Sequence, residues 1–565
     1  MRKLYDGAEM RAMDKWAIEI AGISGLELME RAAHAVAERI LQGECAATAI
    51  ICGTGNNGGD GYAAARMLRE AGCRADVYVI GDPGRIRGDA KVNYDRLGGQ
   101  GVFAGLPGET AGAAAPAAAG ASVSAGAAEF EPAAVSAAST RYTCVVDALF
   151  GTGLDRPLAG AALAAVQWIN AWKAADARRR VISVDIPSGI HAGTGQILGD
   201  AVRADETVTI SRWKTGLLLY PGRTYAGKVY LEDIGEEEPN PVSDAARTRC
   251  YSKKDIRRIL PARSADSHKG TYGKLLVAAG SPGMMGAAVF AASAAYRAGA
   301  GLVNAVIPAE EGQTMTLAVP EAVQTRYIDP ADCADQQARA NDLTQLRLPE
   351  CSAAVVGPGL GKNAILLRKV LAMRVPTVVD ADALNLIAAD PSILEESRVD
   401  SVAKDLASDA GNGPDNAVRL IFTPHMGEAS RLSGKTVAEL YQDLPGNAAE
   451  LAKRFHAVVV LKNASTVIAD PEGRICVNRT GNNGMSTAGS GDVLAGTIGG
   501  LLAQAASGGL DGTGSKSAAE RLFELACAGV WLHGKAGDAA AKRTGYYALT
   551  ASDLVRYMRP DRLVK

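Results

Sequence analysis

Short apolar runs alternate with amphipathic stretches along most of this 565-residue chain. Apolar runs that end in glycine or a polar residue are typical of buried strands, and the stretches between them have helical spacing. This alternation predicts α/β architecture, with parallel sheets covered by helices on both faces. In the first half the expected strands are TAIICG (48–53), ADVYVIG (75–81), TCVVDALFG (143–151), RVISVDIPSG (180–189) and ETVTIS (206–211).

The same alternation returns in the second half with different motifs. No residue-level repeat links the halves, so we expect two unrelated α/β domains. Residues 235–250 combine an acidic run, prolines and polar residues, which is a linker composition. We therefore expect domains at 1–240 and 251–565, joined by a linker at 241–250. The expected strands of the second domain are KLLVAAGS (274–281), GLVNAVIP (301–308), AAVVGPGLG (353–361), PTVVDADALN (376–385), LIFTPHMGE (420–428) and AVVVLKNAST (457–466).

The charge balance argues against a polyanionic partner. The chain has 60 basic and 62 acidic residues, a formal net charge of −2, so we expect no nucleic-acid binding. The first residues carry charges and no apolar signal segment, and glycines and Arg297 interrupt the apolar stretch at 283–308. We expect a cytoplasmic protein without a membrane span. The nine cysteines have no metal-binding spacing, and their odd number argues against a disulfide framework.

Three segments are expected to be looping insertions without chemistry, because they are rich in glycine and small or polar residues. They are 104–129, 405–417 and 506–520.

A glycine-rich segment, GTGNNGGDG (53–61), follows the first expected strand. Its glycines allow close approach of a ligand to the backbone, and a helix starting at Gly61 would offer free amides to an anion. The paired asparagines separate this segment from the dinucleotide fingerprint GxGxxG and suit a carboxamide or a ribose. The alternative is a turn rich in asparagine and aspartate.

Carboxylates also end two further strands, where ligands of parallel sheets bind. Asp147 precedes a flexible loop whose Arg156 is suited to a phosphate, and Asp185 begins DIPSG (185–189). Each aspartate alone is more often a cap or turn former. Together with the asparagine loop they indicate a site, and Asn57, Asp147 and Ser188 have the oxygen atoms that a hard monovalent cation prefers.

These motifs, with WKTGLLLYPG (213–222), resemble the YjeF-type N-terminal domain, an NAD(P)H-hydrate epimerase, over about residues 10–235. The resemblance implies a Rossmann-like three-layer sandwich that interconverts the epimers of hydrated NADH and NADPH (NADHX and NADPHX). It implies potassium at Asn57, Asp147 and Ser188, and Asp185 as the acid/base residue and a substrate contact. The remaining implied substrate contacts are Asn56, Asn57, Gly58, Gly59, Asp60, Gly151, Thr152, Gly153, Leu154, Asp155, Arg156 and Pro157.

Six polar motifs mark the expected strands of the second domain: DSHKG (266–270), GPGLG (357–361), DADALN (380–385), TPHMGE (423–428), KNAST (462–466) and TAGSGD (487–492). The last runs into an apolar helix, where free amides and the helix dipole attract an anion. Asp492 there is suited to deprotonate a hydroxyl that meets a phosphoryl group. His425 alone is more often a structural histidine, and Lys269 alone a surface charge.

In this order the motifs are similar to the ADP/ATP-dependent NAD(P)H-hydrate dehydratases, a ribokinase-like family, over roughly 255–560. Fusion of both domains is characteristic of bacterial members. Asn463 replaces a glycine of that family, and asparagine tolerates left-handed backbone angles. The resemblance implies Mg²⁺ with ADP as phosphoryl donor, and we also expect a homo-oligomer. It implies dinucleotide contacts at Ala287, Gly359, His425 and Asp492, and adenine-nucleotide contacts at Lys462, Asn463, Ala464, Ser465, Thr466 and Gly491.

The expected chemistry is repair of a reduced nicotinamide that carries a hydroxyl on C6. Asp492 would accept the hydroxyl proton while a phosphoryl group is transferred to that oxygen, after which phosphate and a C5 proton leave. The products would be NAD(P)H, AMP and phosphate. Asp185 would shuttle a proton during epimerisation, through either a ring-opened or an iminium intermediate.

Two alternatives stay open from the sequence. The second domain could be a vitamin kinase of the same superfamily, which shares the glycine-rich turn but not TPHMGE and DSHKG. The first domain could be a binding module without activity, against which Asp147, Asp185 and the asparagine loop argue.

Overall fold

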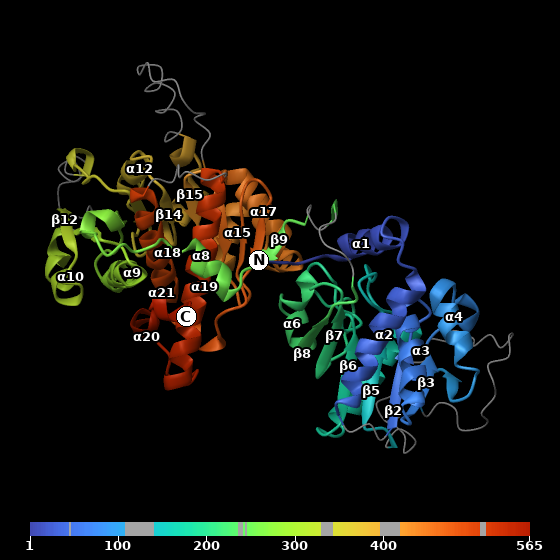
Figure 1. Cartoon of the computed structure of the whole chain (residues 1–565). Helices are drawn as coiled ribbons and strands as arrows, with labels where there is room; N and C mark the ends of the chain where they lie inside the picture. Colours follow the sequence, from blue (N-terminus) through green and yellow to red (C-terminus); the bar gives the residue numbers. More distant parts are fainter. Residues whose placement is uncertain are drawn as a thin grey trace. The chain divides into compact units, whose positions relative to one another are not determined.

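The computed structural model describes residues 1–43, 47–107, 141–235, 241–242, 246–328, 343–395, 418–508 and 516–565. These residues form two compact units. The N-terminal unit is Lys3–Thr248; the C-terminal unit is Arg249–Lys565 together with Met1–Arg2. Figure 1 shows a sheet with helices against it in each unit.

The N-terminal unit is built on a parallel sheet whose described strands run in the order β4-β3-β2-β5-β6-β7-β8. The order reverses between β2 and β5, and in such sheets ligands bind beyond the carboxyl ends of the strands at this point. The strands are β2 (Ala47–Cys52), β3 (Arg74–Val79), β4 (Val102–Ala104), β5 (Cys144–Ala148), β6 (Arg180–Val184), β7 (Glu206–Ile210) and β8 (Lys228–Glu232).

Alternate strand residues face two separate helix layers in this unit. Ile50 and Val146 pack with α2 and α3 on one face, whereas Ile51 and Val145 pack with α5 on the other. Both faces are apolar because both are covered, which confirms the predicted three-layer arrangement. The helices are α1 (Gly7–Glu19), α2 (Gly25–Leu41), α3 (Asn56–Glu70), α4 (Gly88–Arg96), α5 (Gly160–Ala174) and α6 (Gly222–Tyr225), with 3₁₀ turns η1 (Pro83–Arg85) and η4 (Thr215–Leu217).

The C-terminal unit has a larger sheet, whose described strands run in the order β1-β9-β18-β17-β16-β15-β14-β13-β10-β11-β12. The segment from β12 to β16 is parallel, and β17 and β18 continue it antiparallel. The strands are β1 (Arg2–Lys3), β9 (Thr248–Cys250), β10 (Lys274–Ala278), β11 (Leu302–Pro308), β12 (Val323–Tyr327), β13 (Ala353–Val356), β14 (Thr377–Val379), β15 (Leu420–Phe422), β16 (Val458–Leu461), β17 (Val467–Ala469) and β18 (Ile475–Val477).

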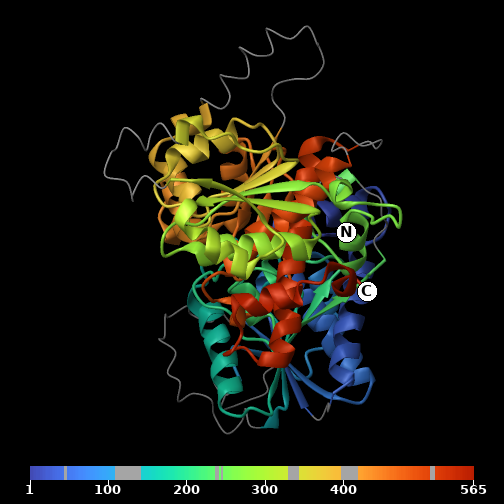
Figure 2. The ribbon, with the colours of Figure 1, turned by 90° about the vertical axis from the view of Figure 1, so that its left-hand side faces the viewer.

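Helices lie above and below this sheet (Figure 2). The core on one face joins α9, α18 and α19 to the strands. The helices are α8 (Lys253–Ile259), α9 (Met285–Ala298), α10 (Gly312–Ala318), α12 (Ala364–Leu371), α13 (Asp382–Ala389), α15 (Met426–Ser433), α16 (Val437–Gln442), α17 (Leu444–Phe455), α18 (Ser490–Ser507), α19 (Ala518–Thr544), α20 (Ala551–Tyr557) and α21 (Pro560–Leu563), with 3₁₀ turns η5 (Lys269–Tyr272), η6 (Ala309–Glu311) and η7 (Asn483–Met485).

Helix α18 approaches its neighbours along a line of glycines. A Cβ on Gly496 would stand 2.1 Å from the carbonyl oxygen of Ala291, and one on Gly500 2.6 Å from that of Ala295, both in α9. A Cβ on Gly499 would lie 2.3 Å from the Val355 side chain of β13. Since carbon atoms at these distances overlap, only glycine allows the helix to pack this closely.

Several sequence predictions differ from this fold. The sequence did not predict several strands, because their short or mixed runs lack a clear period; these are β1, β4, β8, β12, β17 and β18. Thr248–Cys250, in the expected linker, forms β9, and α18 extends to Ser507, into the third expected insertion. Residues 108–129 and 405–417 of the other two insertions lie outside the described residues.

The motif DSHKG precedes β10, as expected from the sequence, and does not share the strand ends at which the other motifs lie. It therefore stands at the amino end of that strand, whereas the other motifs follow strands or begin α18. There the Oγ of Ser507, the last residue of α18, donates to the carbonyl oxygen of Thr271 over 2.9 Å. The motif thus stands at the opposite end of α18 from Asp492.

Within the described part of the chain, no helix has both the length and the apolar character to cross a membrane.

Candidate active sites

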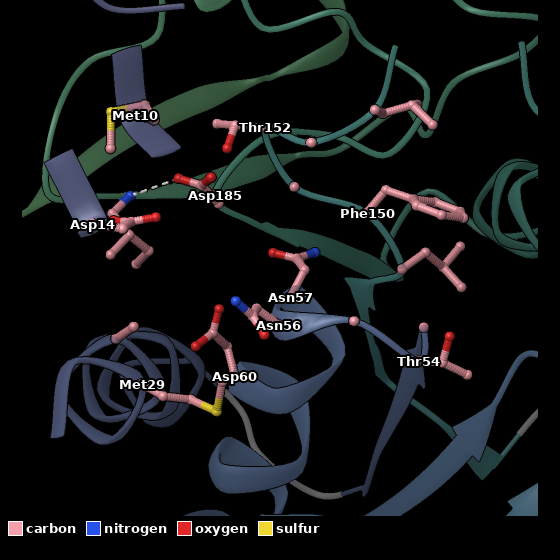
Figure 3. A pocket seen from close by; sticks show the side chains of 18 of the residues that line it. Met10, Asp14, Met29, Thr54, Asn56, Asn57, Asp60, Phe150, Thr152 and Asp185 are labelled. Atoms are coloured by element: carbon pink, nitrogen blue, oxygen red, sulfur yellow. Dashed lines mark hydrogen bonds between the residues drawn. The ribbon is translucent and has the colours of Figure 1, made fainter. Parts of the chain in front are cut away.

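A cavity of about 800 Å³ opens at the carboxyl ends of the strands in the N-terminal unit (Figure 3). Helix α1 contributes Met10 and Asp14, α3 contributes Asn56 and Asp60, and the loop after β5 contributes residues 149–154. The labelled side chains of Asp60 and Asp185 approach the cavity from different walls, one from α3 and one from the end of β6. The volume and the mixed apolar and polar lining suit a ligand of nucleotide size.

The asparagine segment is part of a helix, so the predicted start at Gly61 was wrong. Helix α3 begins at Asn56, directly after the N-cap Gly55. A Cβ on Gly58 would stand 1.9 Å from the carbonyl oxygen of Gly53, and one on Gly59 2.6 Å from the Met29 side chain. These glycines allow the helix to pack against β2 and α2, and their backbone is buried. The free amides of the first turn therefore belong to Asn56 and Asn57.

Asp185 is held in an unusual backbone conformation by a buried lysine. Its φ angle is 66°, in the left-handed region that costs energy for an aspartate. The ammonium group of Lys214 donates to Asp185 Oδ1 and, over 2.6 Å, to the carbonyl oxygen of Ile210. The amide of Ile210 donates to the same carboxylate oxygen over 3.1 Å. Lys214 is 0% exposed, so this ion pair is screened from water and fixes the carboxylate.

The three expected potassium ligands lie around the loop that follows β5. Asp147 accepts hydrogen bonds from Ser188 Oγ at 2.6 Å, Ser188 N at 2.8 Å and Ser183 Oγ at 2.8 Å. Asn57 Oδ1 lies 3.2 Å from the point that a Cβ on Gly151 would occupy, and Asn57 Nδ2 is buried without a partner among the described residues. Burial raises the pKa of Asp147, and its hydrogen bonds oppose that effect. The Asn57 amide, the buried Asp147 carboxylate and the Ser188 hydroxyl all offer oxygen atoms, and such a donor set fits a potassium ion.

Most of the predicted contacts of the N-terminal site line one cavity, and some do not. Asn56, Asn57, Asp60, Asp185 and the expected residues Gly151, Thr152, Gly153, Leu154 and Arg156 are among its lining. Gly58 packs against the backbone of Gly53 after β2 and Gly59 against Met29 of α2, and Asp155 and Pro157 stand outside the lining.

The strand-end motifs of the C-terminal unit meet around a half-buried lysine, Lys462. Lys462 Nζ donates to Asp380 Oδ1 over 2.8 Å and lies 4.0 Å from Glu428 Oε2. A Cβ on Gly491 would stand 3.4 Å from the same Nζ atom. Burial lowers the pKa of Lys462, but the Asp380 and Glu428 carboxylates outweigh it and raise the pKa overall. The lysine is therefore a permanent positive charge beneath the glycine-rich turn.

Asp492 lies in the first turn of α18, beside this lysine. The helix begins at Ser490 after Gly489, whose φ is 85°. The pKa of Asp492 is raised to about 6 by burial and by the charge of Asp380, with Lys462 opposing the shift. A carboxylate with this pKa is ionised at neutral pH and accepts a proton readily, which suits a general base.

His425 has a structural role that the sequence left open. Its Nδ1 accepts from the amide of Gly427 over 2.9 Å, and its own amide donates to Glu428 over 2.8 Å, so it caps α15. The His425 side chain is 55% exposed, so the imidazole atoms that do not cap the helix are accessible to a ligand. A bridge between His425 and Lys462 joins the ends of β15 and β16.

The other predicted residues of this unit fall into two groups. Gly359 and Ala287 are neighbours, since a Cβ on Gly359 would stand 3.2 Å from that of Ala287. In KNAST, the Asn463 side chain stabilises the turn by accepting a hydrogen bond from the amide of Ala464 over 2.7 Å, and Ser465 is 1% exposed.

The backbone of Asn463 does not need the left-handed conformation. Among described residues other than glycine, positive φ angles occur only at Asp185, Ser211, Arg374, Ala381 and His456. Asn463 therefore does not use the left-handed conformation.

Three charged or polar groups were missed from the sequence. Lys214 lies in the motif WKTGLLLYPG, where a lone lysine shortly after a strand is a signal of a buried charge. Glu428 lies in TPHMGE, and the sequence assigned it no role. His533 had no signal; it is buried in α19, its Nε2 lies 3.4 Å from Ser490 Oγ, and burial lowers its pKa to about 4.

The two units each carry a candidate site at the carboxyl ends of parallel strands in an α/β sheet, which is the arrangement of a two-domain α/β enzyme. A family model described as "NAD(P)H-hydrate dehydratase" matches residues 275–560, and one described as "YjeF-related protein N-terminus" matches residues 25–216. The bifunctional NAD(P)H-hydrate repair enzyme of Moorella thermoacetica is 36% identical over 98% of this chain and 96% of its own length. That of Thermofilum pendens is 37% identical over 98% of this chain and 94% of its own.

The chain belongs to the family of bifunctional NAD(P)H-hydrate repair enzymes. Among solved structures, the ADP/ATP-dependent NAD(P)H-hydrate dehydratase of Bacillus subtilis, co-crystallised with ATP and Mg²⁺, is 27% identical, with a TM-score of 0.44, over 56% of this chain and 98% of its own.

Proposed function

We propose that this chain repairs hydrated nicotinamide cofactors in two reactions. The N-terminal unit interconverts the (R) and (S) epimers of NADHX and NADPHX, and the C-terminal unit dehydrates the (S) epimer to NADH or NADPH with consumption of ADP. The observation that carries the proposal is the co-occurrence of both domains on one chain, with 36% identity to a bifunctional repair enzyme across almost its whole length.

Dehydration requires that a poor leaving group, hydroxide, be converted into a good one. Asp492 accepts the proton of the C6 hydroxyl while that oxygen attacks the terminal phosphoryl group of ADP, which releases AMP. The free amides at the start of α18 and the ammonium group of Lys462 stabilise the charge on the transferred group. The ring nitrogen then assists loss of phosphate, and the C5 proton leaves to restore the dihydropyridine.

The residues proposed to bind the adenine nucleotide are those of KNAST, namely Lys462 to Thr466, together with Gly491. Since Lys462 already pairs with Asp380 and Ser465 is buried, the turn would offer mainly backbone groups and exposed Ala464 to the nucleotide. In the described part of the chain, no group of three or more histidine, cysteine or acidic side chains is arranged to hold a metal. Mg²⁺ would therefore arrive on the phosphates of ADP, as is usual for this ion.

Epimerisation requires acid/base assistance at C6, the carbon that carries both nitrogen and hydroxyl. Asp185 would supply it, since its carboxylate faces the cavity and is fixed by Lys214. Asn57, Asp147 and Ser188 would hold a potassium ion, whose charge would offset the buried carboxylate and order the loop at 149–154. The substrate would occupy the cavity between this loop and the first turn of α3.

A direct assay tests both reactions. Purified full-length protein is incubated with mixed NADPHX epimers, with ADP or without it, and the epimers are separated chromatographically. Without ADP we expect interconversion only, and with ADP both epimers should disappear while absorbance of the reduced nicotinamide returns. Loss of the (S) epimer alone would exclude the epimerase, and a stable phosphorylated product would identify a kinase instead.

A further inference from the structure

The two carboxyl groups on opposite walls of the N-terminal cavity have different surroundings. Asp185 has a full set of donors, from Lys214 and from the amide of Ile210. Asp60, on α3, has no hydrogen-bond or ion-pair partner among the described residues. A carboxylate held by a lysine is stable as the anion, whereas a carboxyl without a donor favours its proton.

The groups that face Asp60 reinforce this difference. The cavity wall near Asp60 includes apolar side chains of α2, namely Leu28, Met29 and Ala32. The charged groups around it are Asp14 of α1, Asp185 at the end of β6 and, with the opposite sign, Lys214. Burial first, and then the two aspartates, raise the pKa of Asp60 well above its usual range. Asp60 therefore favours its protonated form, whereas Asp185 is paired with the ammonium group of Lys214, and such a contrast is characteristic of acid–base pairs.

We infer that Asp60 is the proton donor and Asp185 the proton acceptor of epimerisation, acting on opposite faces of the nicotinamide ring. This inference rests on the epimerase activity proposed above. Asp60 gives its proton to the C6 hydroxyl, the C6–O bond breaks with its electron pair on oxygen, and water leaves as the ring nitrogen forms the iminium ion. Water then adds to C6 from the other face and loses a proton to Asp185.

Atoms and charges balance in this step: one water leaves, one water adds, and a proton has moved from Asp60 to Asp185. Lys214 favours return of that proton, through solvent, to Asp60. The opposite epimer reacts by the reverse path, in which the proton first resides on Asp185, Asp185 donates it to the C6 hydroxyl, and Asp60 accepts a proton from the water that adds. The pair thus selects water loss over ring opening, because protonation of the hydroxyl assists departure of oxygen and not cleavage of the C6–N bond.

The test is performed on the full chain without ADP, so that no substrate is lost to the dehydration reaction. Asp60→Asn should lower the epimerisation rate at least about 100-fold, the usual contribution of a general acid, while the (S) epimer is still dehydrated normally once ADP is added. Asp60→Glu should restore part of the rate. Asp176→Asn is the control, at a partly exposed aspartate outside the cavity lining that pairs with Arg178, and it should leave both rates unchanged.

Two measurements separate this role from a structural one. In ¹⁸O-labelled water the inverted epimer should carry one solvent oxygen per conversion, and retention of the original oxygen would overturn the inference. The acid-side and alkaline limbs of the wild-type pH profile should reduce to a single limb in Asp60→Asn. Epimerisation by Asp60→Asn within threefold of wild type would also overturn it, whereas failure of the wild type to interconvert epimers would instead refute the proposed function.

Discussion

Lys462 Nζ lies 2.8 Å from Asp380 Oδ1 and directly beneath the glycine-rich turn that carries Asp492. Both partners come from the ends of parallel strands, β16 and β14. The lysine is thus the one cation shared by Asp380, Glu428 and Asp492 in the described site. Its positive charge stabilises three acidic side chains and ties the glycine-rich turn to the carboxyl ends of β14 and β16.

Replacement of Lys462 by methionine should therefore shift the pH dependence of dehydration. Without the ammonium group the pKa of Asp492 rises further above 6, because Asp380 still raises it and nothing opposes that effect. The acid limb of kcat for dehydration should move to higher pH, and the rate at pH 7 should fall at least tenfold. A profile that keeps its midpoint would show that Lys462 does not act on Asp492. Epimerisation by the same preparation is the internal control.

Asp492→Asn should abolish dehydration and keep dinucleotide binding. Loss of a general base lowers the rate by about 100- to 10,000-fold, whereas the amide preserves size and hydrogen bonding. In the wild type, the rate should fall about tenfold per pH unit below the pKa of about 6, as the base becomes protonated. Titration with the (S) epimer in the absence of ADP measures binding. Turnover comparable to wild type would eliminate Asp492 as the base.

The same substitution should make the C-terminal unit more stable at neutral pH. The pKa of Asp492 is higher in the folded chain than in the unfolded one, so the ionised side chain costs folding free energy above about pH 6. That cost is at most about 2 to 3 kcal/mol, and it disappears as the pH falls below about 4. Thermal denaturation of Asp492→Asn should give a higher Tm than wild type at pH 7.5 and an equal Tm at pH 4. Equal values at both pH values would contradict the raised pKa.

Lys214→Met should leave the half-buried Asp185 without its counter-ion. Because the carboxylate then loses the ammonium group that fixes its position, epimerisation should fall at least 100-fold while dehydration of the (S) epimer continues. Lys214→Arg tests whether charge alone suffices; because the Lys214 side chain is fully buried, a larger guanidinium group should restore little activity. The rates of both reactions on one sample provide the comparison. Normal epimerisation by Lys214→Met would show that the ion pair has only a structural role.

Gly58→Ala should destabilise the N-terminal unit. The added methyl group would stand 1.9 Å from the carbonyl oxygen of Gly53, a backbone atom that cannot move without displacing β2. Overpacking of this kind costs about 1 to 3 kcal/mol in the free energy of unfolding. Urea unfolding monitored on the full chain should show a lower midpoint for this unit alone. Gly55→Ala is the matched control, since its Cβ position is open.

The sequence predicted the layers and the strand-end motifs, because long buried runs such as residues 48–52 and 458–461 have few alternatives to a buried strand. It misplaced the start of α3 by five residues, because glycines and asparagines are read locally as a loop, whereas here they fit a helix against a strand. It could not reveal the Lys214–Asp185 ion pair or the contact of His533 with Ser490, since these join residues far apart in the chain.

The glycine line of α18 has a consequence for how the activity can change. The carboxylate at the head of this helix owes its location to backbone contacts along the next turns, at residues that meet no reactant. A single methyl group at Gly496 or Gly500 would push the helix off α9 and carry Asp492 away from Lys462. Inactivating variants should therefore also occur at the small residues of α18 that lie far from the reacting groups. Selection for altered catalysis should succeed more readily through changes in the loops than through changes in this helix.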